Sequence, residues 1–166
     1  MLRSAVVLSF VVVTLGLAAC SSAPPETREA DLQAIAALRD AYTSAFTAED
    51  AAKAAAAFAP DGILMNDNAP AVAGREAIRA HYEKLMAGMD CQVELTPEET
   101  VVNGDWAFDR GQTLVHIMAK DPKSSAPMIM DQGKYVAILR RQPDNSWLIG
   151  RVIANSNISL PPPDGK

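Results

Sequence analysis

The hydrophobic period of this chain changes near residue 91, and that change limits the folds it can adopt. Before Cys91, apolar residues mostly recur at steps of three and four, as on an amphipathic helix. After Cys91 the chain reads as long extended runs. Helices first and strands last favour an α+β domain with helices packed on one face of a sheet. A length of 166 residues suits one such domain with short extensions.

The helical half contains three expected helices and one short strand. Residues Asp31–Phe58 are predicted to be helical, with a second helix opening at Thr47–Asp50, which approximates a capping box. Pro60–Gly62 ends this helix, and Ile63–Asn66 forms a short apolar strand. Gly74 precedes a third helix over Arg75–Met86.

The second half is expected to form a curved antiparallel sheet. Cys91–Val102 is extended and is interrupted at Pro97. Asn103 and Gly104 form a strong hairpin signal. Trp106–Asn155 then contains three strands separated by polar turns, which predicts an antiparallel meander.

The first twenty residues have the pattern of a secretory signal. Arg3 supplies a positive charge, and Ala5–Ala19 is apolar but too short for a permanent membrane-spanning helix. Leu17–Cys20 resembles the lipobox of bacterial lipoproteins; the alternative is an ordinary signal peptide with a chance cysteine. The resemblance implies that Cys20 is lipidated and anchors the protein to the membrane. It places the protein in the bacterial cell envelope, facing the periplasm, with Ser21 matching the outer-membrane sorting pattern.

Composition excludes several other classes of function. A net charge of −5 argues against a nucleic-acid surface, which needs clustered positive charge. Lipidation of Cys20 leaves Cys91 alone, which predicts a small buried apolar residue. Two histidines without paired spacing predict no metal site, and no cofactor is expected. The expected organisation is a signal peptide (1–19), the lipidated cysteine with a tether (20–28), one domain (29–157) and a proline-rich tail (158–166).

A series of short motifs runs through the domain in a characteristic order. They are Phe58–Gly62, Gly74–Ile78, Asn103–Ala107, Gly133–Tyr135 and Asp144–Trp147. Together they resemble the nuclear transport factor 2-like superfamily, which includes ketosteroid isomerases and SnoaL-like cyclases. The resemblance implies a cone-shaped, barrel-like fold: three N-terminal helices pack on a curved antiparallel sheet that leaves a pocket open at one end. This fold hosts both enzymes and proteins without catalytic activity, so it implies no function by itself.

An isomerase mechanism of this superfamily needs a carboxylate base and an oxyanion hole made by a tyrosine and a protonated aspartate. The resemblance puts Tyr42 at the tyrosine donor and Tyr82 beside it, but Asn66 at the base and Ala137 near the second acid. An amide does not abstract a proton at ordinary pH. Asp67, one residue on, is expected on the opposite face of the strand. The sequence therefore leans against enzymatic activity.

The pocket is expected to carry six polar residues, contributed by helices and strands far apart in the chain. They are Tyr42, Asn66, Tyr82, Gln112, His116 and Tyr135. The resemblance turns the strand face of His116 toward the pocket, where a histidine can act as a general base. The alternative for His116 is a half-exposed strand residue without a role.

Three functions remain open from the sequence. The favoured one is a lipid-anchored envelope domain whose cone binds a small apolar or amphipathic molecule. The first alternative is an isomerase, dehydratase or cyclase-like enzyme that uses Tyr42 and His116. The second is an envelope interaction module that forms a homodimer through its outer sheet face. Both pocket functions were expected to need Tyr42 and His116 in one compartment and a cone that side chains leave unfilled.

Overall fold

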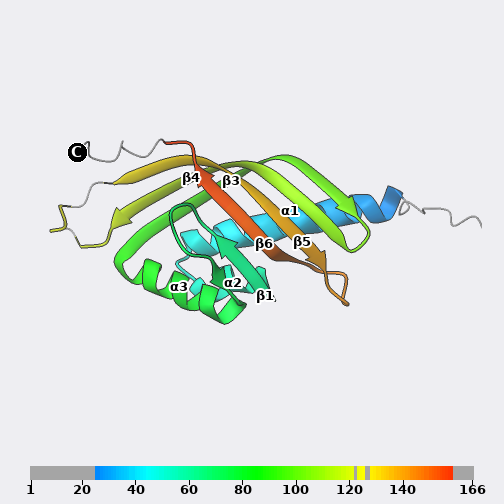
Figure 1. Ribbon diagram of the computed structural model, residues 1–166, viewed down its shortest axis with the longest axis horizontal. Coiled ribbons are helices and arrows are strands. Elements are labelled where there is room, and N and C mark those ends of the chain that lie inside the picture. The colour runs from blue at the N-terminus through cyan, green and yellow to red at the C-terminus, as the bar shows by residue number, and fades with distance from the viewer. Residues whose placement is uncertain (1–24, 122, 126–127, 159–166) are drawn as a thin grey trace, which may run out of the picture.

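A computed structural model describes residues 25–121, 123–125 and 128–158, in which a curved sheet arches over a long helix (Figure 1). The expected signal peptide, the lipidated Cys20 and all of the proline-rich tail except Ile158 lie outside these residues, so they stay predictions. Within the described part of the chain, no helix is long and apolar enough to cross a membrane.

Three helices occupy the N-terminal half: α1 (Pro25–Thr47), α2 (Ala51–Ala56) and α3 (Arg75–Gly88). Helix α1 begins inside the segment expected to be a tether, because Pro25 suits a first helical position. The expected helical stretch is interrupted where Glu49 adopts a positive φ of 53°. Asp50 then caps α2 by accepting a hydrogen bond from the Lys53 amide. Phe58, expected at the end of this helix, instead begins the first strand.

Six strands form one sheet in the order β2-β1-β6-β5-β4-β3. Their bounds are β1 Phe58–Met65, β2 Val72–Ala73, β3 Met89–Asn103, β4 Trp106–Ala119, β5 Ile129–Arg141 and β6 Trp147–Ser156. The antiparallel meander from β4 to β6 and the β3–β4 hairpin are confirmed. The expected wholly antiparallel sheet is wrong at β1, which pairs parallel with β6. Pro60–Gly62 lies within β1, where the register with β6 shifts, rather than before the strand.

The sheet bends where its strands approach most closely. Opposite β4, strand β3 carries a register shift between Pro97 and Glu99. Gly111, the β4 residue facing Pro97, has no room for a side chain: an added Cβ would lie 2.1 Å from the Thr96 carbonyl oxygen. Bulges and glycines of this kind let a sheet curve sharply. This curvature lets the sheet wrap around α1 (Figure 1).

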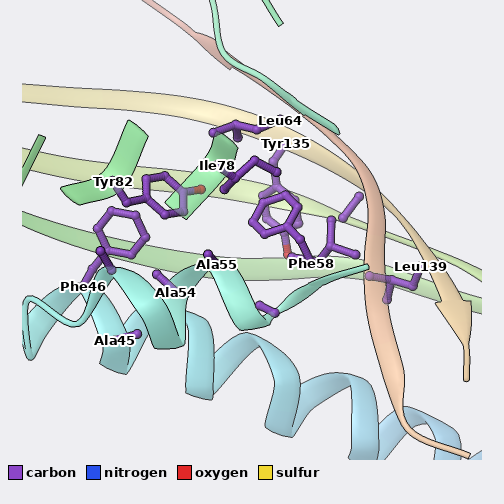
Figure 2. Packing of buried hydrophobic residues seen from close by; sticks show 14 of the residues in the cluster. Ala45, Phe46, Ala54, Ala55, Phe58, Leu64, Ile78, Tyr82, Tyr135 and Leu139 are labelled. Carbon is purple, nitrogen blue, oxygen red and sulfur yellow. The ribbon is translucent and has the colours of Figure 1, made fainter. Parts of the chain in front are cut away.

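The core fills one side of the space between the helices and the concave sheet face. Figure 2 shows the rings of Phe46 and Tyr82 side by side, and their centroids lie 5.0 Å apart in an edge-to-face arrangement. Buried alanines such as Ala54 and Ala55 on α2 allow close packing. Cys91 is buried, as expected, and burial raises the pKa of its thiol.

An ion pair fastens the first half of α1 to the sheet. The buried carboxylate of Asp31 accepts hydrogen bonds from both Nη atoms of Arg141 and from the indole of Trp147. Hydrogen bonding to Arg141 holds the pKa of Asp31 below its ordinary value, despite burial. Since Asp31 lies on α1 and Arg141 on β5, this contact fixes how the helix crosses the sheet.

Candidate functional site

A cavity of about 810 Å³ lies between α1, α3 and the concave face of the sheet. Side chains therefore do not fill the cone, and the volume falls in the range of small-molecule sites. One end is closed by the buried residues Ile35, Leu139 and Ile149. At the other end Ile129 and Ile158 line the cavity while remaining more than half exposed, which marks the mouth.

The wall between these ends is largely apolar. It includes side chains of β3, β4 and β6, namely Val93, Leu95, Val115, Ile117 and Val152. Polar residues also line the cavity, and most of them gather in three places along it. Such a cavity suits a molecule with an apolar body and a small number of polar groups.

The first polar group is a pair of buried tyrosines on two helices. The hydroxyl oxygens of Tyr42 on α1 and Tyr82 on α3 lie 2.9 Å apart. Burial raises the pKa of Tyr42 to about 12 and also raises that of Tyr82, so both are protonated at neutral pH. Since one hydroxyl donates to the other, the second proton remains available to an acceptor atom on a bound molecule.

The second polar group surrounds Asp109 on β4, whose side chain is 2% exposed. Its Oδ1 accepts hydrogen bonds from Arg39 Nη1 at 2.9 Å and from the Thr100 hydroxyl at 2.6 Å. Its Oδ2 accepts from the Tyr135 hydroxyl at 2.8 Å. Burial and the bond to this carboxylate raise the pKa of Tyr135, so its hydroxyl stays protonated. Three side chains thus hold the Asp109 carboxylate in place.

The third polar group lies toward the mouth. It includes Asn66, Asp67 and Asn68, which follow β1, and Asp131 on β5, which accepts a hydrogen bond from the Ser156 hydroxyl at 2.6 Å. Asn66 and Asp67 both line the cavity, although opposite faces were expected for them. The reason is that β1 ends at Met65, so strand alternation no longer applies to either residue.

Four of the six expected pocket residues line the cavity, namely Tyr42, Asn66, Tyr82 and Tyr135. Gln112 and His116 do not, and their expected placement is corrected. The lining residues of β4 are Asp109, Thr113, Val115 and Ile117. Alternation along the strand puts Gln112 and His116 on the outer face. The sequence pattern defines two faces of this strand but does not say which of them faces the helices.

On the outer face, Gln112 donates a hydrogen bond to Glu98. The ring Nε2 of His116 is buried and has no hydrogen-bond partner among the described residues. Tyr42 and His116 thus lie in different compartments, which removes the pair on which the enzyme alternative depended. The condition that both pocket functions share, Tyr42 and His116 in one compartment, is therefore not met for binding either. The other condition, a cone that side chains leave unfilled, is met, and Tyr42 lines that cavity without His116.

Arg39 and Asp109 are two of the cavity residues that are absent from the six expected ones. Arg39 lies on the apolar face of α1, between Ile35 and Tyr42, where a charged residue is costly unless it has a partner. A charged residue on an apolar helix face was therefore the sequence signal that could have identified Arg39 as a cavity residue. Their contact joins residues 70 positions apart, which no local pattern reveals.

In the described segments, no three His, Cys, Asp or Glu side chains come together in a way that suits a metal ion. The cavity instead offers hydroxyl and amide groups and the Arg39–Asp109 ion pair. His81 and two acids near the mouth also line it.

Solved structures with the same fold come from several bacteria. A ketosteroid isomerase-like protein from Erwinia carotovora is 24% identical, with a TM-score of 0.68 over 78% of this chain and 98% of that one. A Mycobacterium tuberculosis protein of unknown function is 22% identical, with a TM-score of 0.71 over 82% and 78%. A nuclear transport factor 2-like protein from Novosphingobium aromaticivorans is 22% identical, with a TM-score of 0.67 over 81% and 87%.

At these identities the likeness establishes the fold alone, and no curated protein matches the chain. Residues 38–155 match the SnoaL-like domain family, and this range contains all three polar groups of the cavity. With most of its length matched and a cone-shaped fold around α1, this chain belongs to the SnoaL-like domain family of the nuclear transport factor 2-like superfamily.

Proposed function

We propose that this protein binds a small apolar or amphipathic molecule in its cavity, as a lipid-anchored domain of the bacterial cell envelope. The observation that supports binding is the open cavity of about 810 Å³, with apolar walls and a few polar groups. The lipobox-like segment ending at Cys20 supports the anchoring and the outer-membrane location.

Three features favour binding without catalysis. An amide, Asn66, stands where the superfamily's isomerases use a carboxylate base. The Asp109 carboxylate is held by hydrogen bonds from Arg39, Thr100 and Tyr135. His116, the candidate base, lies on the outer face. The cavity therefore offers donors that hold a molecule, but not the acids of the isomerase mechanism.

Filling the cavity with a larger side chain is expected to lower its affinity for a bound molecule. Val115 lines the cavity wall, so Val115→Phe places an aromatic ring in the space that a ligand needs. Overpacking costs about 1–3 kcal/mol, which corresponds to a fall in affinity of roughly 5- to 150-fold. The measurement is a titration of the full chain with N-phenylnaphthylamine, a neutral apolar dye whose fluorescence rises on burial.

The matched control is Leu114→Phe, one residue earlier on β4 and on the outer face. It should bind the dye as the unsubstituted chain does. A chain that does not bind the dye, or equal affinity in the two variants, would contradict the proposed function.

A second candidate function, self-association through the outer sheet face, is favoured by apolar side chains exposed there. They are Met118, Met130, Val136, Ile138 and Ile153, each at least 40% exposed. Exposed apolar side chains on one face are costly to leave in water. We therefore propose a homodimer that buries this face and leaves the cavity mouths free.

Sedimentation tests the homodimer directly. The chain should sediment as a dimer at roughly 20 μM, well above a Kd of about 1 μM. Ile138→Lys should yield monomers because it buries an unpaired charge in the interface. Ala80→Lys, on an exposed position of α3, should leave the dimer intact. A monomeric unsubstituted chain, or one unaffected by Ile138→Lys, would argue against this interface.

A further inference from the structure

Arg39 lies inside the cavity, near its closed end. It projects from α1 on the same face as Ile35 and Tyr42, and its side chain is 17% exposed. Its partner Asp109 is the first residue of β4 to line the cavity. The closing residues Ile35, Leu139 and Ile149 lie at the same end. A guanidinium group therefore faces the deepest part of an otherwise apolar space.

The hydrogen bonds of Arg39 leave most of its donors unused. A guanidinium carries five N–H donors. Among the described residues, the side-chain bond recorded for Arg39 runs from Nη1 to Asp109. The Nε–Nη2 edge remains, and two parallel donors on one edge match the two oxygens of a carboxylate. Among the described residues, the buried side-chain atom without a partner is His116 Nε2, so this edge of Arg39 is accessible from the cavity and an acceptor on a ligand can reach it.

Asp109 acts as a positioning residue for this guanidinium. Thr100 and Tyr135 hold its carboxylate in place, and the carboxylate in turn holds one side of Arg39. Because the pair is neutral as a whole, the empty cavity does not carry an uncompensated charge. The arrangement orients the Arg39 guanidinium without using its second edge.

The other charged groups of the cavity lie toward the mouth. Asp131 pairs with Val115 across the β4–β5 ladder, six residues along β4 from Asp109. At about 3.3 Å per residue, the two acids are separated by roughly 20 Å along the strand. Asp67 lies near the mouth as well, following β1. A negatively charged group is therefore disfavoured at the mouth. At the closed end the Arg39–Asp109 pair is neutral as a whole, and the unused donors of Arg39 are what favour a carboxylate there.

We propose that the cavity binds a medium- or long-chain carboxylic acid, with the carboxylate on the Nε–Nη2 edge of Arg39 and the chain running along the apolar wall toward the mouth. This inference rests on the proposed function and adds to it the class of ligand and its orientation. The planar edge of Arg39 selects a carboxylate over an alcohol or ester, because only the carboxylate offers two charged acceptors.

The test is displacement of N-phenylnaphthylamine from the full chain by laurate, and separately by methyl laurate. The decisive quantity is the ratio of the two displacing concentrations, compared between variants. The main variant is Arg39→Met with Asp109→Asn, because removing Arg39 alone would leave a buried unpaired carboxylate. Arg110→Met is the control, since Arg110 pairs with Glu98 and Glu99 on the outer face.

In the unsubstituted chain and in the Arg110→Met control, laurate should displace the dye at about tenfold or more lower concentration than methyl laurate, the effect of charged hydrogen bonds. The double variant should bind the dye normally but lose this preference. Arg39→Lys should retain only part of it, because lysine keeps the charge but not the planar edge.

Two results would overturn the inference. If the unsubstituted chain binds the dye but shows no preference for laurate, the carboxylate site is wrong and the proposed function stands. If the preference persists in the double variant, Arg39 is not the anchor. Failure to bind the dye at all would instead count against the proposed function.

Discussion

Asp109→Ala is expected to lower the free energy of unfolding by about 3–5 kcal/mol, the typical cost of removing one partner from a buried ion pair. The substitution leaves the Arg39 guanidinium in the cavity without its carboxylate. It also deprives the hydroxyls of Thr100 and Tyr135 of their acceptor. Urea denaturation followed by circular dichroism measures the loss as a lower midpoint at an unchanged slope.

Two further variants separate charge from shape in this prediction. Asp109→Asn keeps the size of the side chain and should cost less than Asp109→Ala. Adding Arg39→Met to Asp109→Ala should recover part of the loss, because the unpaired charge is removed as well. A loss below about 1 kcal/mol for Asp109→Ala would mean that the ion pair is solvated like a surface pair and that the closed end of the cavity is wet.

Gly111→Ala is the second substitution with a large expected effect. The new Cβ would lie 2.1 Å from the Thr96 carbonyl oxygen and 2.8 Å from the Pro97 Cα. Both contacts are with backbone, which cannot rotate away as a side chain can. We expect at least about 3 kcal/mol of destabilisation, the upper range for overpacked sites. The measurement is again denaturation, with hydrogen exchange to locate the disturbance at the β3–β4 bulge.

Gly88→Ala is the matched control for this substitution. Gly88 is the last residue of α3, and an added Cβ there meets no atom within 4 Å. Alanine in that helix should be neutral or stabilising by about 0.5–1 kcal/mol. Equal and small effects at both positions would show that the strands at Gly111 lie farther apart than described, and that the sheet curves by another means.

Together these substitutions probe how the cavity is built. Gly111 permits the bend that brings β4 and β5 around α1, and Asp109 anchors α1 to that bend through Arg39. The same two features give the cavity a closed end with a positively charged donor. Stability and ligand selection therefore both depend on Asp109. This residue stabilises the fold through its ion pair and also holds Arg39 in the closed end of the cavity.

Much of the local structure could be predicted from the sequence, because it depends on short-range rules. The alternation and turn residues of the second half gave β4 as Trp106–Ala119, with its hairpin to β3 at Gly104. The period of apolar residues after Gly74 predicted α3. The motif order predicted the superfamily, which the match over residues 38–155 confirms.

Tertiary structure alone decided which side of each element faces the cavity and which distant residues meet there. Alternation assigns His116 and Asp109 to opposite faces of β4, but only the packing of α1 makes the face of Asp109 the inner one. The parallel pairing of β1 with β6 joins segments about 90 residues apart. The Arg39–Asp109 contact likewise spans the chain. Periodicity follows from the geometry of a single helix or strand. These contacts form only when the curved sheet has closed over α1, so they cannot be predicted from a short-range sequence pattern.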